Sequence, residues 1–364
     1  MKLNEGKIEW GKRMAFKKLI SIYEFSQVNY LFWNKELRSK IKVNTIDKLK
    51  MLRKGFHGES KIIYQLSSNN YSNYISDYHR LYSKFINKKY SFILNNKVIF
   101  AHTFKDFIKV PRSYALIEKG RIIPLESNLR DFATFIEHLN SNKFGVLKPI
   151  SGGGGKGVLI LKVENGEIYV NNKLTTTEHL KNILESLDDY FYSQFINQSE
   201  FSKSFNPTTL NSIRIVTMID PKTNKAFIPI AVQRIGTNQS APADNWTQGG
   251  ISAEINIENG ILGKGVTYPF NSNVTWLDKH PDTGLNIEGV KIPEWNKIKE
   301  TLLDVANKFP YIKYVGWDVV LTEQGVMVIE GNNCSDVNLL QVHRPLLKDH
   351  KVRDFYKYHG IIKN

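Results

Sequence analysis

The first quarter of the chain repeats apolar residues at the spacing of an α-helix, with lysine and arginine filling many of the positions between them. The repeating positions near the start are Phe16, Leu19, Ile20, Tyr23 and Val28. Residues 55–58, which contain two glycines, interrupt the pattern, and it resumes over residues 74–81. Residues 1–95 are therefore predicted to form a mainly helical region.

Near residue 96 the pattern changes to short apolar runs and short helical segments. Ser127 is placed to cap a helix whose apolar stripe spans residues 129–139. Thr175 and Glu178 have the spacing of a capping box before a second helix. Strands and helices are thus mixed in this part of the chain, which predicts an α+β body.

A run of four glycines lies between two of these short apolar runs. Gly152, Gly153, Gly154 and Gly155 follow Lys148, and the aliphatic run 158–161 comes soon after them. That run is too short and too aliphatic for an amphipathic helix, so the stretch reads as strand, glycine loop, strand. Glycines without a Cβ let backbone N–H groups converge on an anion, which makes phosphate a candidate ligand of this loop.

Other glycine-rich nucleotide loops do not fit. The Walker A spacing is absent, and the glycines that match a dinucleotide fingerprint by letter do not run into a helix. A protein-kinase loop places its lysine after the glycines, whereas Lys148 precedes them, and neither His-Arg-Asp nor Asp-Phe-Gly follows. A protein kinase is therefore not expected.

Two carboxylates and an amide are gathered in a predicted hairpin near the end of the chain. Asp318 interrupts the apolar run 314–321, and Glu330 and Asn332 share one face of the run 326–332. Pairing the two runs brings Asp318 roughly opposite the other two side chains, and such a group resists burial unless a cation joins it. Oxygen ligands of this kind suit Mg²⁺ held partly by phosphates, and zinc is disfavoured because no His/Cys cluster exists.

Three further features have two interpretations each. Arg214 lies in the predicted strand 211–218, where it is either a surface residue or a fork for a carboxylate or phosphate. The polar segment 244–251, with Gly249 and Gly250, is either an active-site loop or a turn. His280 is either a proton carrier or substrate contact, or an ordinary loop histidine.

Composition and charge add to this picture. The chain has 364 residues, 41% of them hydrophobic, and a net charge of +15. Residues 1–90 hold 19 Lys and Arg against 7 Asp and Glu, a net charge of +12. This excess either attracts a polyanion, such as an acidic polysaccharide or a lipid surface, or forms the solvated face of an accessory helical domain. Nucleic acid is not expected, because no recognised binding motif accompanies the charge.

The chain carries a single cysteine, Cys334, so it has no internal disulfide and fits a reducing compartment. Its first residues lack the apolar core of a signal peptide, and no run approaches the roughly 18 apolar residues of a spanning helix. A cytoplasmic protein is expected, with contact at the inner face of the membrane left open.

Taken together, these residues resemble the nucleotide site of the ATP-grasp superfamily. The resemblance is closest to the sugar-transfer-associated ATP-grasp family, found among bacterial capsule and surface-polysaccharide biosynthesis genes. The matching positions, in chain order, are Lys97, Lys148, the glycine loop, the hinge 194–197, Arg214, Asp318, Glu330 and Asn332. Other positions resemble the sugar-transfer-associated family specifically and are candidate substrate residues. They are Asn211, Asp244, Asn245, Gly249, Gly250 and His280.

The resemblance implies an α+β ATP-grasp fold with two α+β subdomains around an ATP cleft, preceded by the helical basic region. The expected bounds are 1–95, 96–197, 198–345 and a basic tail 346–364.

It also implies roles for the phosphate and metal residues. Lys97 and Lys148 would reach the α- and β-phosphates, and Gly152 to Gly155 would close over the β- and γ-phosphates. Asp318, Glu330 and Asn332 would hold two Mg²⁺ ions, with Glu330 bridging them. Arg214 would neutralise the γ-phosphate during transfer.

The adenosine contacts follow from the same resemblance. The backbone of Phe195 and Ile196 would grip adenine, and Gln194 would meet its amine at a position where an acidic residue is commoner. Glu200 is the nearest candidate for the ribose.

The activity implied is ATP-dependent ligation of a carboxylate to an amine through an acyl phosphate, on a surface-polysaccharide precursor. The alternatives are a kinase of a sugar or lipid-linked hydroxyl and a non-catalytic nucleotide-binding scaffold. The partners implied are carboxylate and amine (or hydroxyl) substrates, including an acidic polysaccharide or a lipid-linked sugar.

Overall fold

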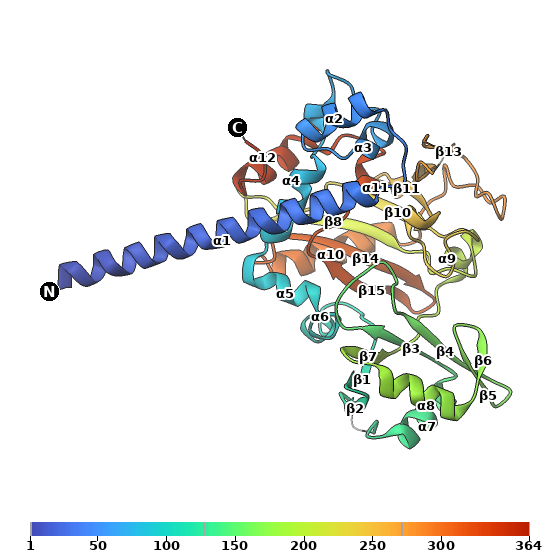
Figure 1. Cartoon of the computed structure of the whole chain (residues 1–364). Helices are drawn as coiled ribbons and strands as arrows, with labels where there is room; N and C mark the ends of the chain where they lie inside the picture. Colours follow the sequence, from blue (N-terminus) through green and yellow to red (C-terminus); the bar gives the residue numbers. More distant parts are fainter. Residues whose placement is uncertain (1, 127, 271, 364) are drawn as a thin grey trace.

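Two antiparallel β-sheets, each covered by helices, form the body of the protein in the computed structural model, which describes residues 2–126, 128–270 and 272–363. Helices precede these sheets in the chain, and they pack against both faces of the second sheet (Figure 1). The prediction of an α+β body after a helical region is confirmed. Within the described parts of the chain, no helix has the length and apolar character needed to cross a bilayer.

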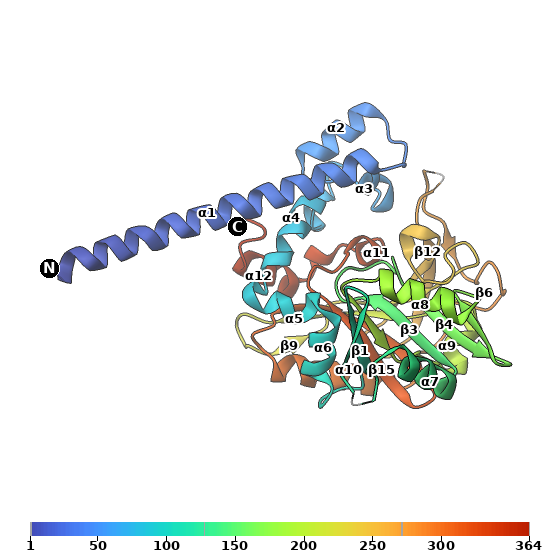
Figure 2. The same ribbon diagram turned by 60° about the horizontal axis from the view of Figure 1, so that its bottom comes forward.

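The N-terminal region consists of one long helix and several short ones. They are α1 (Lys2–Arg38), α2 (Thr45–Arg53), α3 (Gly58–Ile63), α4 (Asp77–Tyr82), α5 (Ser91–Asn95) and three short 3-10 turns, η1 to η3 (Tyr71–Asn73, Ser83–Phe85 and Lys88–Tyr90). Asn44 and Ser76 cap α2 and α4 by accepting backbone N–H groups, which fixes where these helices begin. The N-terminal half of α1 extends away from the body in both Figure 1 and Figure 2.

The first sheet has seven strands in the order β2-β1-β7-β3-β4-β5-β6. Their bounds are β1 (Ser113–Glu118), β2 (Arg121–Pro124), β3 (Phe144–Pro149), β4 (Leu159–Glu164), β5 (Glu167–Val170), β6 (Lys173–Thr175) and β7 (Tyr190–Ser193). Helices α7 (Phe132–Asn142) and α8 (Thr177–Ser186) pack their apolar stripes onto one face, where Phe135 and Leu180 meet Leu147 and Leu161 in a single core. The glycine loop therefore joins two neighbouring strands, β3 and β4.

The two helix starts in this half differ in detail from the prediction. Asp131 caps α7 and forms a capping box with Thr134, while Ser127 lies outside the described residues. Thr176, one residue after Thr175, caps α8 by accepting the backbone N–H of His179 at 3.1 Å. The predicted capping box of Thr175 and Glu178 is therefore wrong by one residue, because Thr175 is the last residue of β6 and the helix starts after Thr176.

The second sheet has the order β13-β12-β11-β10-β8-β14-β15, with the short β9 paired to β8. Its strands are β8 (Ile213–Ile219), β9 (Ala226–Phe227), β10 (Ala231–Ile235), β11 (Ile251–Ile255), β12 (Leu262–Thr267), β13 (Trp276–Leu277), β14 (Tyr314–Thr322) and β15 (Gly325–Asn332). Every residue of β8 is buried, because the strand lies in the middle of a sheet covered on both faces.

The helices that cover this sheet come from different parts of the chain. On one face α6 (Lys97–Phe104) and α10 (Trp295–Lys308) pack against Ile215 and Trp317, and α9 (Glu200–Phe205) joins the same core. The other face is covered by residues 51–86 of the N-terminal region, α11 (Asn338–Gln341), the turn η5 (Leu346–Lys348) and α12 (His350–Tyr358), whereas α5 packs through Leu94 on the same face as α6. Phe355 and Tyr356 of α12 are fully buried, so this part of the basic tail packs as an integral core element.

Candidate functional site

Three adjacent strands of the second sheet place three charged side chains in one row. In the sheet register, Arg214 of β8 lies opposite Asp318 of β14, which in turn lies opposite Glu330 of β15. Side chains that face each other across paired strands point to the same side of the sheet. The predicted pairing of Asp318 with Glu330 is therefore present, and Arg214 continues the row.

Arg214 holds Asp318 as a fork. Its Nε donates to Oδ1 of Asp318, and its Nη2 donates to Oδ2 at 3.0 Å. Its Nη1 donates to the hydroxyl of Ser335 at 3.2 Å. Both Arg214 and Asp318 are buried, so of the two interpretations of Arg214 the carboxylate fork is the one realised.

A second arginine, Arg234 of β10, also reaches Asp318 and was missed in the sequence. Its Nη1 lies 3.2 Å from Oδ2 of Asp318, and its Nη2 lies 2.5 Å from Oδ1 of Asp244. Asp244 also accepts from the backbone N–H and hydroxyl of Ser212 at 2.8 and 2.5 Å. The available signal was a charged residue inside the apolar run 231–235, but its face depends on the β10-β8 pairing.

The surroundings shift the pKa values of the two carboxylates of the row in opposite directions. Burial opposes the charge of Asp318, but the arginines at 214 and 234 outweigh it and hold the pKa of that carboxyl below its ordinary value. Burial raises the pKa of Glu330, and the negative charge of Asp318 raises it further. A cation beside Glu330 would relieve its repulsion with Asp318, so this carboxylate favours binding one.

Two lysines approach Glu330 from outside the second sheet. Lys97, the first residue of α6, lies with its Nζ 3.9 Å from Oε2 of Glu330, and the same Nζ donates to the carbonyl of Gly152 at 2.6 Å. Lys148 is on β3, where removal from water lowers its pKa to about 8 although Glu330 acts in the opposite direction. The structure thus brings Lys97, Lys148, the glycine loop and Glu330 together.

The glycine loop of the first sheet lies close to the polar loop that follows β10 of the second sheet. Gly152, Gly154 and Gly155 have φ values of 100°, 73° and 71°, which side chains rarely adopt. A Cβ placed on Gly154 would lie 3.6 Å from Nδ2 of Asn245, so this loop of the first sheet lies against the polar loop of the second. Gly153 has open space where a Cβ would be, as Gly152 does.

A metal in this site would depend on few protein ligands. Among the residues that the structure describes, no three His, Cys, Asp or Glu side chains are grouped in a way that could hold a metal. Asn332 donates through Nδ2 to the carbonyl of Gly316 at 3.1 Å, which orients its amide. The donor set of Glu330, Asp318 and Asn332 is all oxygen and suits Mg²⁺ that also binds phosphates. These oxygen donors fit the predicted Mg²⁺, although Asp318 also forms ion pairs with Arg214 and Arg234.

The hinge residues follow β7 directly. The backbone of Gln194 donates to the carbonyl of Arg112 at 2.9 Å, and Oε1 of Gln194 accepts the N–H of Arg112 at 3.2 Å. The ring of Phe195 stacks on Phe144, with ring centroids 4.8 Å apart, and Ile196 comes next in the same loop. Adenine binding by these residues stays a prediction.

Glu200 lies at the start of α9, where its side chain is 81% exposed and pairs with Lys203 at 2.7 Å. Its backbone N–H donates to Oε1 of Glu323 at 2.6 Å. A ribose contact by Glu200 also stays a prediction.

Several of the candidate substrate residues are engaged by the surrounding backbone. The Nδ2 of Asn211 donates to the carbonyls of Ser202 and Asn206 at 2.9 and 2.8 Å. His280 is 1% exposed, and its Nε2 lies 2.9 Å from the carbonyl of Gly236. These hydrogen bonds hold the loops beside β8 and β10 in place, and they form without a bound substrate.

The remaining candidates build the turn after Asp244. Oδ1 of Asn245 accepts the N–H of Thr247 at 3.2 Å. Gly249 has a φ of 112°, and a Cβ on Gly250 would lie 2.6 Å from the carbonyl of Asp244. Both glycines are therefore required by the backbone, and the loop presents Asn245 to the glycine loop.

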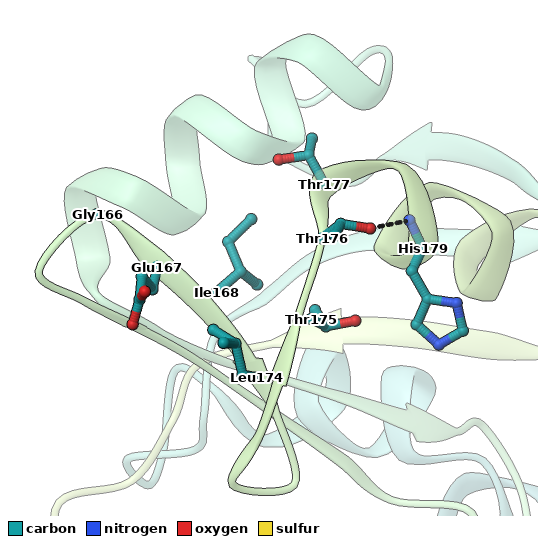
Figure 3. Close-up of a pocket in the computed structure, with 8 residues that line it drawn as sticks. All are labelled: Gly166, Glu167, Ile168, Leu174, Thr175, Thr176, Thr177 and His179. Atoms are coloured by element: carbon teal, nitrogen blue, oxygen red, sulfur yellow. Dashed lines mark hydrogen bonds between the residues drawn. The ribbon is translucent and has the colours of Figure 1, made fainter.

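A separate hollow of about 570 Å³ lies at the far edge of the first sheet. It is lined by Gly166, Glu167, Ile168, Leu174, Thr175, Thr176, Thr177 and His179 (Figure 3). None of the predicted site residues lines it, and its polar groups come from one hairpin and one helix start. The predicted phosphate and metal residues Lys97, Glu330 and Asp318 lie in the other cluster, beside the glycine loop and the second sheet.

A sequence profile of the sugar-transfer-associated ATP-grasp family matches residues 77–352. The chain belongs to this family. The resemblance noted in the sequence is thereby confirmed, and the profile begins after α1, α2 and α3. No curated protein matches the chain.

Several solved structures match the chain at low sequence identity, with TM-scores below 0.5. An ADP complex of N5-carboxyaminoimidazole ribonucleotide synthetase is 9% identical with a TM-score of 0.39, covering 71% of this chain and 52% of that one. The D-alanine-D-alanine ligase from Coxiella burnetii is 13% identical with a TM-score of 0.39, covering 74% and 59%.

The ATP-grasp ligase PsnB, solved with a minimal precursor, Mg and ADP, is 12% identical with a TM-score of 0.34, covering 72% and 59%. The family member described here thus spans between about half and three fifths of the length of these proteins.

Proposed function

We propose that this ATP-grasp protein binds ATP with two Mg²⁺ ions between its two sheets and ligates a carboxylate to an amine. The observation that supports the proposal is the meeting of Lys97 and Lys148 with Glu330, which in turn adjoins the Asp318–Arg214 pair. Cations from one side and carboxylates from the other suit a magnesium-bound triphosphate, and phosphoryl transfer needs mainly positioning and positive charge.

In this proposal the two lysines hold the α- and β-phosphates, and the glycine loop from Gly152 to Gly155 covers the β- and γ-phosphates. Glu330, Asp318 and Asn332 hold the Mg²⁺ ions, with Glu330 between them. When bound, Mg·ATP supplies an activated phosphoryl group. Backbone groups of Phe195 and Ile196 hold adenine, Gln194 meets its amine, and Glu200 is the candidate for the ribose.

Arg214 is the proposed catalytic residue, and Arg234 is its partner. Both guanidinium groups share Asp318, so neither can rotate freely, and their remaining N–H groups are fixed in direction. A fixed positive charge beside the transferring phosphoryl group stabilises the charge that develops on its oxygens. Asp244 holds Arg234 from the other side and completes this arrangement.

The reaction proposed has two steps. A carboxylate oxygen of the substrate attacks the γ-phosphorus, and the bond to ADP breaks. An amine then attacks the carbonyl carbon of the acyl phosphate, and phosphate leaves with one former carboxylate oxygen. Since the family is associated with sugar transfer, we propose a surface-polysaccharide precursor as the substrate, with a uronic acid or a sugar amine joined to an amino acid. We place this reaction in the cytoplasm.

Isotope transfer tests the proposal and separates a ligase from a kinase. The protein is incubated with Mg·ATP, a panel of ¹⁸O-carboxylate uronic acids and a panel of amino acids, and the released phosphate is analysed by mass. A ligase transfers one ¹⁸O to phosphate and forms an amide. A phosphorylated acceptor without ¹⁸O in phosphate would establish the kinase alternative, and no ADP with any pair would contradict both activities.

A further inference from the structure

Helix α1 presents a row of large apolar side chains to solvent. Within its described side chains, the exposed members of the row are Leu19 (63%), Ile22 (55%), Tyr23 (60%), Tyr30 (68%), Trp33 (48%) and Leu37 (82%). Their positions, spaced by three, four or seven residues apart from the neighbours Ile22 and Tyr23, place them along one face of a helix. Single exposed apolar residues are ordinary, but six large ones along one face, interrupted only at Ser26 and Gln27, mark an interaction surface.

The opposite face of the same helix is attached to the body. Val28 and Phe32 are buried and pack with Leu81 of α4. Glu36 accepts the backbone N–H of Gly58 at 3.0 Å and pairs with Lys48 of α2 at 2.8 Å. The helix is thus fixed in orientation by one face, which directs the row away from the body. Figures 1 and 2 both show α1 extending beyond the body on the N-terminal side.

The composition of the row and its surroundings indicates what covers it. Tyrosine and tryptophan are the side chains that proteins place at the boundary between lipid headgroups and acyl chains. Arg38 ends the helix, and residues 1–90 carry a net charge of +12, whereas Lys35 lies on the attached face and pairs with Glu59 at 3.1 Å. Apolar and aromatic residues on one face, with cations beside them, form the pattern of a helix that lies in the surface of an anionic bilayer.

A second copy of the chain is a poorer occupant. Ile20 and Phe25 lie on either side of the row and are 41% and 57% exposed, so the apolar surface is wider than the narrow seam that two paired helices cover. Positions beside such a seam are usually charged and pair across it, whereas here they are apolar. Pairing would also bring two strongly basic regions together without an acidic counterpart.

We infer that α1 docks this protein onto a bilayer surface containing anionic phospholipids, with Tyr23, Tyr30, Trp33 and Leu37 at the boundary of headgroups and acyl chains. The helix lies on the membrane and does not cross it, in keeping with the lack of a spanning segment among the described residues. This inference goes beyond the proposed ligase activity and does not depend on it.

Vesicle co-sedimentation of the full-length protein tests the inference. The vesicles contain phosphatidylglycerol and phosphatidylcholine in equal parts, or phosphatidylcholine alone. The variant Trp33→Ser/Leu37→Ser is compared with Trp276→Ser/Leu174→Ser, which removes an exposed tryptophan and an exposed leucine from β13 and β6 and leaves α1 unchanged. We expect binding to the anionic vesicles, and a loss of at least about tenfold in partition coefficient for the first variant alone.

Three outcomes would overturn the inference. They are no sedimentation with anionic vesicles, equal loss of binding in both double variants, and concentration-dependent dimers that Trp33→Ser/Leu37→Ser abolishes without any effect on vesicle binding. Circular dichroism spectra and thermal midpoints of both variants verify that they are folded, which their exposed positions lead us to expect. Binding to anionic vesicles that weakens as salt rises supports the electrostatic part of the inference.

Discussion

Arg214 and Asp318 face each other on adjacent strands and are joined by two hydrogen bonds through both carboxylate oxygens. The acidic residue that we propose as a magnesium ligand is therefore already held by the arginine that we propose for phosphate. Such a pair is costly to break inside a protein, because either partner alone would be a buried and uncompensated charge. The pair accordingly fixes the geometry of the site before any ligand binds.

Replacing Asp318 with asparagine should destabilise the fold as well as the activity. Asp318 is 2% exposed and pairs with two arginines, so Asp318→Asn leaves both without their shared charge. We expect a loss of about 3 kcal/mol in the free energy of unfolding, measured by denaturant titration. Asp278→Asn, in an exposed pair with Lys264, should leave the midpoint unchanged. Equal midpoints for Asp318→Asn and the wild type would show that the pair does not organise the site.

The pKa of Lys148 predicts how nucleotide affinity depends on pH. Burial lowers this pKa to about 8, and only the protonated amine attracts phosphate. Bound phosphate raises the pKa again, so affinity should be constant below the free pKa and fall as pH rises through it. We expect the dissociation constant of a non-hydrolysable ATP analogue to be roughly tenfold higher at about pH 9 than at about pH 7. The Lys148→Arg variant keeps its charge over this range and should lack the fall; a fall of equal size in that variant would assign it to another group.

Arg234 and Asp244 should act as a unit. Their side chains lie 2.5 Å apart and both are largely buried, so a double-mutant cycle of Arg234→Met and Asp244→Asn should give a coupling free energy of about 2 kcal/mol. The matched cycle on the exposed pair Lys264 and Asp278 should show no measurable coupling. We also expect each buried variant to lower kcat more than it changes KM. If the effects of the two buried substitutions were additive, the proposal that Asp244 holds Arg234 in position would be wrong.

The glycine loop offers a matched comparison of two glycines. Gly152 and Gly166 have φ values of 100° and 83°, and neither has a neighbour within 4 Å of a Cβ. Alanine at either position should therefore cost about 1 kcal/mol in stability through backbone strain alone. Only Gly152→Ala should weaken nucleotide binding, measured by titration, because only that loop approaches Lys97. Equal nucleotide affinity in both variants would show that the glycine loop does not contact the nucleotide.

The sequence was sufficient for the parts of the site that depend on local pairing. A hairpin brings its two strands side by side, so Asp318 and Glu330 could be predicted to lie near each other. The register could not be predicted, because a bulge between Asp318 and Val319 places Asp318 opposite Glu330, whereas regular pairing from the turn would place it opposite Ile329. Arg234 could not be placed, because its face is set by the pairing of β10 with β8 and the neighbours that pairing brings. The bond of His280 to the carbonyl of Gly236 could not be predicted either, since it joins loops that are 44 residues apart in the sequence.

The apolar pattern of α1 shows the same limit from another direction. Leu19, Tyr23 and Val28 belong to one helical pattern in the sequence, yet the first two are exposed and the third is buried. Periodicity reports that a helix has apolar sides and does not say which side meets the core. The orientation of α1 is set by Phe32 and Glu36, because Phe32 packs with Leu81 of α4 and Glu36 accepts the backbone N–H of Gly58 of α3.

The central claim is that Lys97, Lys148 and Glu330, from different parts of the chain, meet on one magnesium-bound nucleotide. Calorimetric titration of a non-hydrolysable ATP analogue, with and without Mg²⁺, tests it most directly when wild type, Glu330→Gln and the exposed control Glu164→Gln are compared. The account predicts Mg²⁺-dependent binding that Glu330→Gln weakens by at least about tenfold and Glu164→Gln leaves unchanged. Absence of binding to the wild type, or equal Mg²⁺-dependent affinity in all three proteins, would contradict it.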